Sequence, residues 1–277
     1  MSKDFILTTT RNEKLRITAY GIENRNLSSC IILVHGFKGF KDWGFGPYIA
    51  NYFANFGYFV LTFNFSHNGI GKNLIEFTEL DKFANNTFSL EIEELIELIK
   101  AYRNGFFENN LVKKIGLIGH SRGGAISLLT SKIVNEINSV AVWATISKLD
   151  RYSERQKENW RKKGYFEVFN SRTKQKMKLN LSLLEDIEKN KDGILNLEKA
   201  VKELNRPLFI AHGEQDLAAN IKEAQQLYSW SNKAITEFYK FQNTGHTFGI
   251  KHPFENSNSV FEELLNKTKI FFDKNLN

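Results

Sequence analysis

The sequence has a single cysteine, Cys30, which excludes an internal disulfide and a metal site built from several cysteines. Cys30 opens an apolar run, so we expect a buried structural thiol. The first residues contain no long apolar run that would indicate a signal peptide. No other stretch approaches the ~20 apolar residues of a membrane span. We therefore expect a cytoplasmic protein with no membrane partner.

Nucleic-acid motifs, internal repeats and low-complexity tracts are also absent from the sequence. The 277 residues carry a formal net charge of +7, which could suggest an anionic partner. The basic residues are spread over many segments, however, and only residues 151–178 are locally very basic. We therefore expect no nucleic-acid partner. A hydrophobic share of 42% supports a sizeable core, and the length suits one large α/β domain spanning residues 1–277.

Apolar strands alternate with helical stretches from residue 30 onward. Two segments of alternating polarity before them, at 5–10 and 15–21, predict an antiparallel hairpin at a sheet edge. The expected buried strands lie at 30–34, 58–65, 115–118, 140–144, 207–211 and 236–241, and helices at 47–56, 87–102 and 257–272. This order predicts a mostly parallel, doubly wound sheet of eight strands with an antiparallel start.

One segment interrupts this alternation. The roughly sixty residues between the strands at 140–144 and 207–211 far exceed a plain crossover. The patterns predict a polar helix at 152–163, a β-hairpin turning at 170–173, and helices at 181–190 and 192–205. Because such an insertion follows the carboxyl end of a strand, we expect residues 148–192 to form a small cap over that edge of the sheet.

The clearest motif is the pentapeptide Gly-His-Ser-Arg-Gly at 119–123. It stands between the apolar strand at 115–118 and a helical pattern that begins at Ala125. G-x-S-x-G in this position is typical of a nucleophile elbow, a strained turn that exposes the serine hydroxyl. We therefore predict that Ser121 is a nucleophile.

A serine nucleophile needs a base, and the base needs an acid that orients it. The order nucleophile, acid, base in such a fold is matched by Ser121, Asp216 and His246. Asp216 follows the strand at 207–211, and His246 follows the strand at 236–241 in a glycine-bearing loop. Asp150 and His252 are the nearest rivals as acid and base.

Two backbone N–H groups are expected to stabilise the oxyanion that forms in acyl transfer. One belongs to Arg122, directly after the nucleophile at the start of a helix. The other belongs to Phe37, in the loop after the strand at 30–34. The histidines and acids show no metal-ligand spacing such as H-E-x-x-H, so we expect neither a metal nor another cofactor.

At these positions the sequence resembles the α/β-hydrolase superfamily over nearly its whole length. More narrowly, it is similar to bacterial esterases related to cinnamoyl and feruloyl esterases, often described as dienelactone hydrolase-like. The matching segments are residues 35–43, 63–66, 119–124, 170–173, 212–216 and 245–249. The resemblance implies a triad of Ser121, Asp216 and His246, with Phe37 and Arg122 as oxyanion donors. It also implies that the insertion is a cap bearing a hairpin over the substrate pocket.

The sequence departs from this pattern in two places. True dienelactone hydrolases have a cysteine nucleophile where this chain has Ser121, so the resemblance does not extend to their reaction. Residues 217–220 read Leu-Ala-Ala-Asn where polar residues, a valine and a proline are expected after the acid. That change alters the loop and leaves Asp216 in place.

These observations predict a serine hydrolase that cleaves small-molecule carboxylic esters through an acyl-enzyme. Aromatic residues of the cap would suit a short-chain or aromatic acyl group and are our expected substrate contacts: Trp160, Tyr165, Phe166 and Phe169. A serine peptidase or amidase, an acyltransferase, and a non-catalytic ligand receptor on the same fold remain alternatives. The sequence leaves open whether the chain forms a homodimer.

Overall fold

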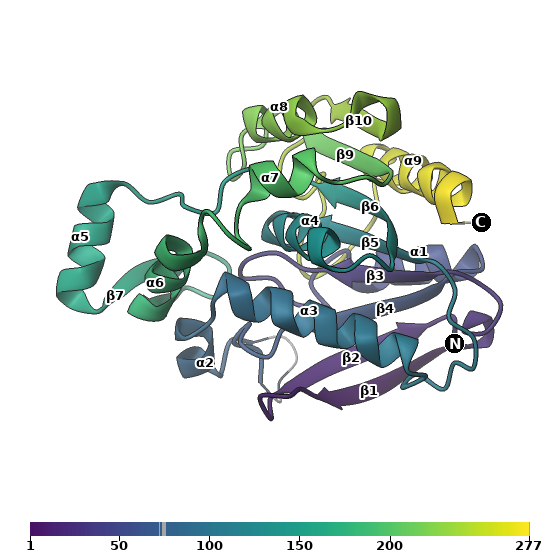
Figure 1. The fold of residues 1–277 in the computed structure, drawn as a ribbon, viewed down its shortest axis with the longest axis horizontal. Helices are drawn as coiled ribbons and strands as arrows, with labels where there is room; N and C mark the ends of the chain where they lie inside the picture. The colour runs from purple at the N-terminus through teal and green to yellow at the C-terminus, as the bar shows by residue number, and fades with distance from the viewer. Residues whose placement is uncertain (72, 74–75, 277) are drawn as a thin grey trace.

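The structure, a computed structural model, describes residues 1–71, 73 and 76–276. Its centre is an eight-stranded sheet in the order β1-β2-β4-β3-β5-β6-β9-β10 (Figure 1). β1 pairs antiparallel with β2 and β2 with β4, whereas the other neighbours are parallel. The bounds are β1 Ser2–Thr8, β2 Lys14–Tyr20, β3 Cys30–Val34, β4 Phe59–Asn64, β5 Ile115–His120, β6 Ile137–Trp143, β9 Leu208–Gly213 and β10 Thr236–Phe241. The predicted fold class is confirmed.

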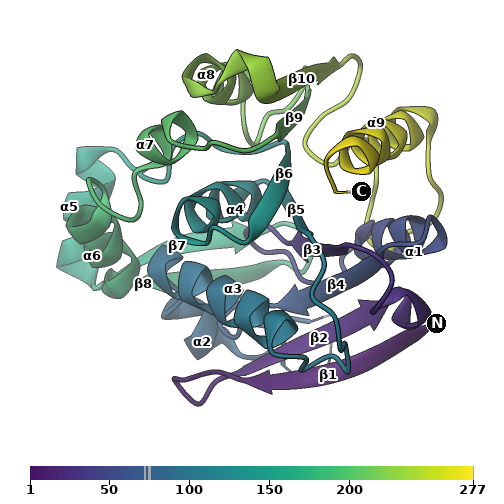
Figure 2. The ribbon, with the colours of Figure 1, turned by 45° about the vertical axis from the view of Figure 1, so that its right-hand side comes forward.

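Helices cover both faces of this sheet, as its doubly wound connections require (Figure 2). α3, α4, α7 and α8 pack on one face, and α1 and α9 on the other. The bounds are α1 Gly46–Asn55, α3 Phe88–Arg103, α4 Arg122–Ile133, α7 Leu197–Lys202, α8 Ile221–Trp230 and α9 Ser259–Leu276. The central strands are buried on both faces, and every residue of β3 and β4 is buried. This explains their continuous apolar runs.

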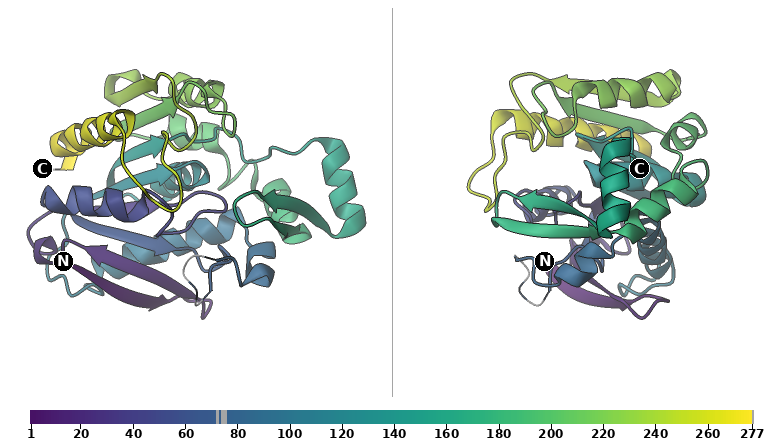
Figure 3. Two further views of the ribbon diagram at one scale, coloured as in Figure 1. Left: turned by 180° about the vertical axis from the view of Figure 1, so that it is seen from behind. Right: turned by 90° about the vertical axis from the view of Figure 1, so that its left-hand side faces the viewer.

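The predicted insertion at residues 148–192 follows β6, and its elements lie beyond the end of the main sheet in Figure 1. It contains α5 (Glu154–Lys163), a hairpin of β7 (Tyr165–Asn170) and β8 (Gln175–Asn180), and α6 (Leu181–Asn190). Figure 3 shows the hairpin and α5 from their outer side. The fully buried Trp160 of the insertion contacts Tyr152 and Phe166, and these residues continue the hydrophobic core of one face of the main sheet.

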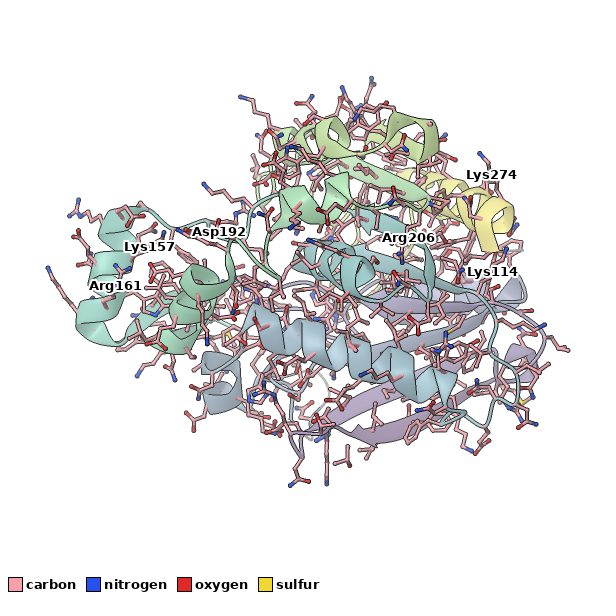
Figure 4. The ribbon with its side chains drawn as sticks, in the orientation of Figure 1. Lys114, Lys157, Arg161, Asp192, Arg206 and Lys274 are labelled. Carbon is pink, nitrogen blue, oxygen red and sulfur yellow. The ribbon has the colours of Figure 1, made fainter. Side chains whose placement is uncertain are left out.

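Ion pairs of α5 hold this unit together at its surface. Lys157 and Arg161 both project from α5 (Figure 4). Lys157 Nζ lies 2.5 Å from Asp150 Oδ2, and Arg161 pairs with Glu188 of α6. The partly exposed pairs contribute little free energy individually, so we attribute the folding of the unit mainly to its buried aromatic residues.

Two predicted stretches differ from the structure. The segment at 66–86, expected to be mainly loop, contains the short helix α2 (Leu80–Ala84). The helix expected at 192–205 is limited to α7, because Asn196 caps it through a 2.8 Å bond from the Lys199 N–H and turns precede it. Two short 3-10 helices complete the list of elements, at Ile22–Asn24 and Lys233–Ile235. None of the helices among the described residues has the length and apolar character needed to cross a membrane.

Candidate active site

Ser121 occupies a sharp turn between β5 and α4. Its φ of 56° and ψ of −122° lie in a region that non-glycine residues rarely adopt. The turn is held in place by its backbone, because the Ser121 N–H donates to Trp143 O at 2.9 Å and Ser121 O accepts from the Gly124 N–H at 3.1 Å. Strain of this kind is typical of a functional site, and the predicted nucleophile elbow has the expected strand-turn-helix form.

The glycines on either side of Ser121 are required by close backbone packing. A Cβ on Gly123 would lie 2.2 Å from Val34 O and 2.5 Å from His35 O. A Cβ on Gly119 would lie 2.5 Å from Gly123 O. Neither position therefore has room for a side chain, which is the reason for the glycines two residues before and after the serine.

His246 and Asp216 come together although thirty residues separate them in the chain. His246 Nδ1 lies 2.7 Å from Asp216 Oδ2. The other carboxylate oxygen, Oδ1, accepts the backbone N–H groups of Ala218 and Ala219 at 2.8 and 2.9 Å. Because an ionised carboxylate can only accept, Nδ1 of His246 carries a proton and its Nε2 is the atom free to accept one.

The side chain of Asp216 is fully buried, with 0% exposed. It is nevertheless ionised. Burial raises its pKa, but the hydrogen bonds from His212, His246 and the Ala219 backbone outweigh burial and hold the pKa well below its usual range. His212 Nε2 lies 3.3 Å from Asp216 Oδ2 and 2.7 Å from Ala219 O, so this histidine braces the acid and its loop. The link between His212 and Asp216 was not predicted from the sequence.

His120 supports the other side of the His246 loop. Its Nε2 lies 2.8 Å from His246 O, and the two rings are 4.8 Å apart between centroids. Desolvation, assisted by the His246 charge, lowers the pKa of His120 to about 3. His120 is therefore neutral near pH 7, and its Nε2–H can donate to the His246 carbonyl. This contact was not predicted from the sequence.

The loop after β3 lies directly against the elbow. The position of a Cβ on Gly36 would be 3.0 Å from Ser121 Cβ and 3.6 Å from Arg122 N, so the backbone at Gly36 runs beside Ser121. His35 fixes this loop: its Nδ1 lies 3.0 Å from Gly36 O, and its Nε2 is 3.3 Å from the Phe65 N. Burial lowers the pKa of His35 to about 4, which keeps it neutral.

The side chain of Arg122 joins this loop to the start of α4. Its guanidinium carbon lies 4.2 Å from the ring centroid of Phe37 and 4.7 Å from that of Phe88. Its Nη1 lies 3.3 Å from Oε1 of buried Glu91. As the first residue of α4, Arg122 has a backbone N–H without a partner inside the helix. The residues predicted as oxyanion donors are thus packed against each other beside Ser121.

Two cavities meet at Ser121 and His246, which line both of them. The smaller cavity, about 140 Å³, is largely aromatic and includes Phe40, Trp43 and Phe45. The larger cavity, about 540 Å³, extends toward the insertion and includes Arg151, Tyr152, Asn170 and Arg172. This arrangement leaves room for a substrate with different groups on the two sides of the reacting atom.

The remaining predicted residues lie elsewhere. Asp150 pairs with Lys157 rather than with a histidine. His252 Nδ1 accepts the Gly44 N–H at 2.9 Å. Trp160 lies in the interior of the insertion, and Tyr165, Phe166 and Phe169 are also not among the residues that line either cavity. The insertion contributes Asn170, Ser171 and Arg172 of its hairpin turn in their place.

No protein-family model and no curated protein matches the sequence. Solved structures resemble it closely in fold. A hydrolase from Agrobacterium vitis S4, described as putative, has a TM-score of 0.76 at 14% identity over 98% of this chain and 99% of its own. Est1E of Butyrivibrio proteoclasticus, with ferulic acid bound, has a TM-score of 0.75 at 15% identity over 98% of both chains. The Pyrococcus furiosus esterase Pf2001 has a TM-score of 0.67 at 21% identity over 100% of this chain and 91% of its own. The chain has the α/β-hydrolase fold.

Proposed function

We propose that this chain is a serine hydrolase of carboxylic esters, with Ser121, His246 and Asp216 as its catalytic triad. The observation that carries the proposal is that a strained elbow serine lines the same two cavities as a histidine hydrogen-bonded to a buried, ionised aspartate. Structural similarity to a hydrolase and to two esterases supports the reaction class.

In the proposed acylation step, Ser121 Oγ attacks the ester carbonyl carbon while its proton passes to His246 Nε2. Asp216 stabilises the imidazolium that forms, because its Oδ2 accepts from Nδ1 at 2.7 Å. The backbone N–H groups of Phe37 and Arg122 stabilise the negative charge on the carbonyl oxygen. The imidazolium then gives its proton to the leaving alkoxide, and the acyl group stays on Ser121.

In the proposed deacylation step, His246 accepts a proton from water, whose oxygen attacks the acyl carbonyl. The tetrahedral intermediate collapses, Ser121 Oγ takes the proton back from the imidazolium, and the carboxylic acid leaves. The same N–H groups serve both steps, since the oxyanion forms at the same place.

The smaller cavity suits a short-chain or aromatic acyl group, because Phe40, Trp43 and Phe45 line a space of only about 140 Å³. The ferulic acid bound to Est1E, a protein of similar fold, supports an aromatic substrate of this size. We further propose that residues 148–192 act as a cap, since the turn of their hairpin lines the larger cavity beside Ser121.

A fluorophosphonate probe tests this proposal directly. We expect covalent labelling at Ser121 only, complete loss of labelling in Ser121→Ala, and much slower labelling in His246→Ala. His252→Ala is the matched control and should label at the wild-type rate. Hydrolysis of 4-nitrophenyl acetate by Ser121→Ala at an unchanged rate would refute the mechanism.

A further inference from the structure

The larger cavity beside Ser121 is strongly cationic. Lys38, Arg122, Arg151 and Arg172 all line it, and the described residues of its wall include no Asp or Glu. The smaller cavity on the other side of Ser121 has Lys38 as its only Lys or Arg within the described chain. An ester that occupies both cavities therefore meets very different surroundings on its two sides.

Three of these four cations are already engaged within the protein. Arg122 pairs with Glu91, and Arg151 pairs with Glu223 at 3.4 Å while donating to Ala218 O at 3.0 Å. Lys38 Nζ donates to Phe169 O at 3.1 Å, which ties the loop after β3 to the hairpin. These contacts shape the cavity wall and reduce what these groups can offer a ligand.

Arg172 differs from the other three because its side chain makes neither an ion pair nor a hydrogen bond with any described residue. Its guanidinium lies over two aromatic rings, 5.4 Å from the centroid of Phe40 and 5.6 Å from that of Phe77. Its Nη2 atom is buried and has no hydrogen-bond partner among the described residues. Stacking holds the planar group in place while one of its donors stays unused.

Asn170, at the other side of the same turn, also has a buried donor without a hydrogen-bond partner among the described residues. It is 5% exposed, and its Oδ1 accepts the Arg172 N–H at 3.1 Å, which fixes the orientation of the amide. This leaves Nδ2 as a buried donor with no hydrogen-bond partner among the described residues. Buried donors without acceptors are costly and uncommon, so two of them in one turn on one cavity wall point to a missing acceptor.

We propose that Arg172 and Asn170 bind a carboxylate of the substrate, so that the ester cleaved by this chain carries an acidic group on the half that occupies the larger cavity. A carboxylate has two acceptor oxygens and full charge, which matches an arginine and an amide donor on a cationic wall. The inference rests on the proposed esterase function and adds the substrate class to it.

Two pairs of nearly isosteric esters test this inference. In one pair the acyl half carries either a carboxylate or a carboxamide: 4-nitrophenyl glutarate monoester is compared with 4-nitrophenyl glutaramate. In the other pair the leaving half carries it: 3-carboxyphenyl acetate against 3-carbamoylphenyl acetate. We expect one pair to show a preference for the carboxylate of about tenfold or more in kcat/KM, the size of a charged hydrogen bond. A response of the leaving-half pair agrees with an acyl group in the smaller cavity, whereas a response of the acyl-half pair would place the acyl group in the larger cavity and overturn that assignment.

Variants then connect the preference with the turn. Arg172→Gln should abolish the preference mainly through KM. Asn170→Asp keeps the oxygen that accepts the Arg172 N–H but replaces the free donor by an anionic oxygen, so it should also weaken the carboxylate ester selectively. Arg155→Gln removes an exposed arginine of the same insertion and should retain the preference.

The outcomes separate this inference from the proposed function. Equal rates for carboxylate and carboxamide esters in both pairs, or a preference that survives in Arg172→Gln, would overturn the inference and leave the esterase proposal standing. Failure to hydrolyse any of the four esters, together with no fluorophosphonate labelling of Ser121, would overturn both.

Discussion

Replacing Asp216 by asparagine should remove catalysis through the tautomer of His246, with little change in shape. Asp216 Oδ1 is held by the N–H groups of Ala218 and Ala219, so the asparagine oxygen would take that position. The amide Nδ2 would then replace the oxygen that lies 2.7 Å from His246 Nδ1. As a donor, it would make Nδ1 the acceptor and move the imidazole proton to Nε2, where it blocks proton transfer from Ser121.

The expected fall in kcat follows from the free energy needed to form the active tautomer of His246 in this variant. With the proton on Nδ1, the N–H of His246 would face the N–H of the substituted amide, in a site where residue 216 is fully buried. This loses a charge-assisted hydrogen bond and leaves buried donors unpaired, together about 4–6 kcal/mol. We therefore expect kcat to fall by about 10³- to 10⁴-fold.

The assay is steady-state hydrolysis of 4-nitrophenyl acetate, with circular dichroism to verify folding. Asp150→Asn is the matched control, because Asp150 is the rival acid and pairs with Lys157 instead; it should retain wild-type kcat. The double variant Asp216→Asn/His246→Ala should be no slower than His246→Ala alone, since both changes disable one unit. An Asp216→Asn enzyme within tenfold of wild type, or an equal loss in Asp150→Asn, would refute the assignment of the acid.

Three further predictions concern stability and reactivity. Burial raises the pKa of Glu94 from 4.5 to about 7, so the folded state binds more protons than the unfolded state between these values. The free energy of unfolding of the wild type should fall as the pH rises through that window. In urea unfolding, the free energy of unfolding of Glu94→Gln relative to wild type should rise by roughly 3 kcal/mol between pH 5 and pH 8. A difference that does not change with pH would contradict this. Gly123→Ala should lose about 3 kcal/mol or more in the same assay, because its Cβ would meet backbone oxygens; wild-type stability would show that the turn can relax. Cys30 is 0% exposed and burial raises its pKa, so a disulfide reagent should modify it only on unfolding; rapid reaction with the folded chain would disprove this.

Elements buried on both faces of the sheet were the most predictable from sequence. The strand expected at 30–34 coincides with β3, because a strand buried on both faces leaves a continuous apolar run. Short surface helices were less predictable. α2 has five residues, too few to leave a helical period, and the helix expected at 192–205 shrinks to the six residues of α7.

The paired acid and base could be predicted because each follows a strand at the same sheet edge, and strand order brings such loops together. Their supporting contacts could not. His212 reaches Asp216 and the Ala219 carbonyl, and His120 reaches the His246 carbonyl across 126 positions of sequence. A histidine at the end of a buried strand leaves the same pattern whether it packs against apolar atoms or braces a catalytic loop.

The hairpin turn of the insertion lines the cavity with polar residues, whereas Trp160 lies in the interior of the insertion. Trp160 is fully buried and contacts Phe166 in the part of the hydrophobic core that lies within the insertion. Aromatic residues in such a segment therefore indicate its interior before they indicate a substrate. The hairpin turn is left to face Ser121, and its Asn170 and Arg172 would read in isolation as an ordinary turn residue and a surface cation. Only the packing of Arg172 over Phe40 and Phe77, about a hundred residues or more earlier in the chain, places that cation on the wall of the cavity.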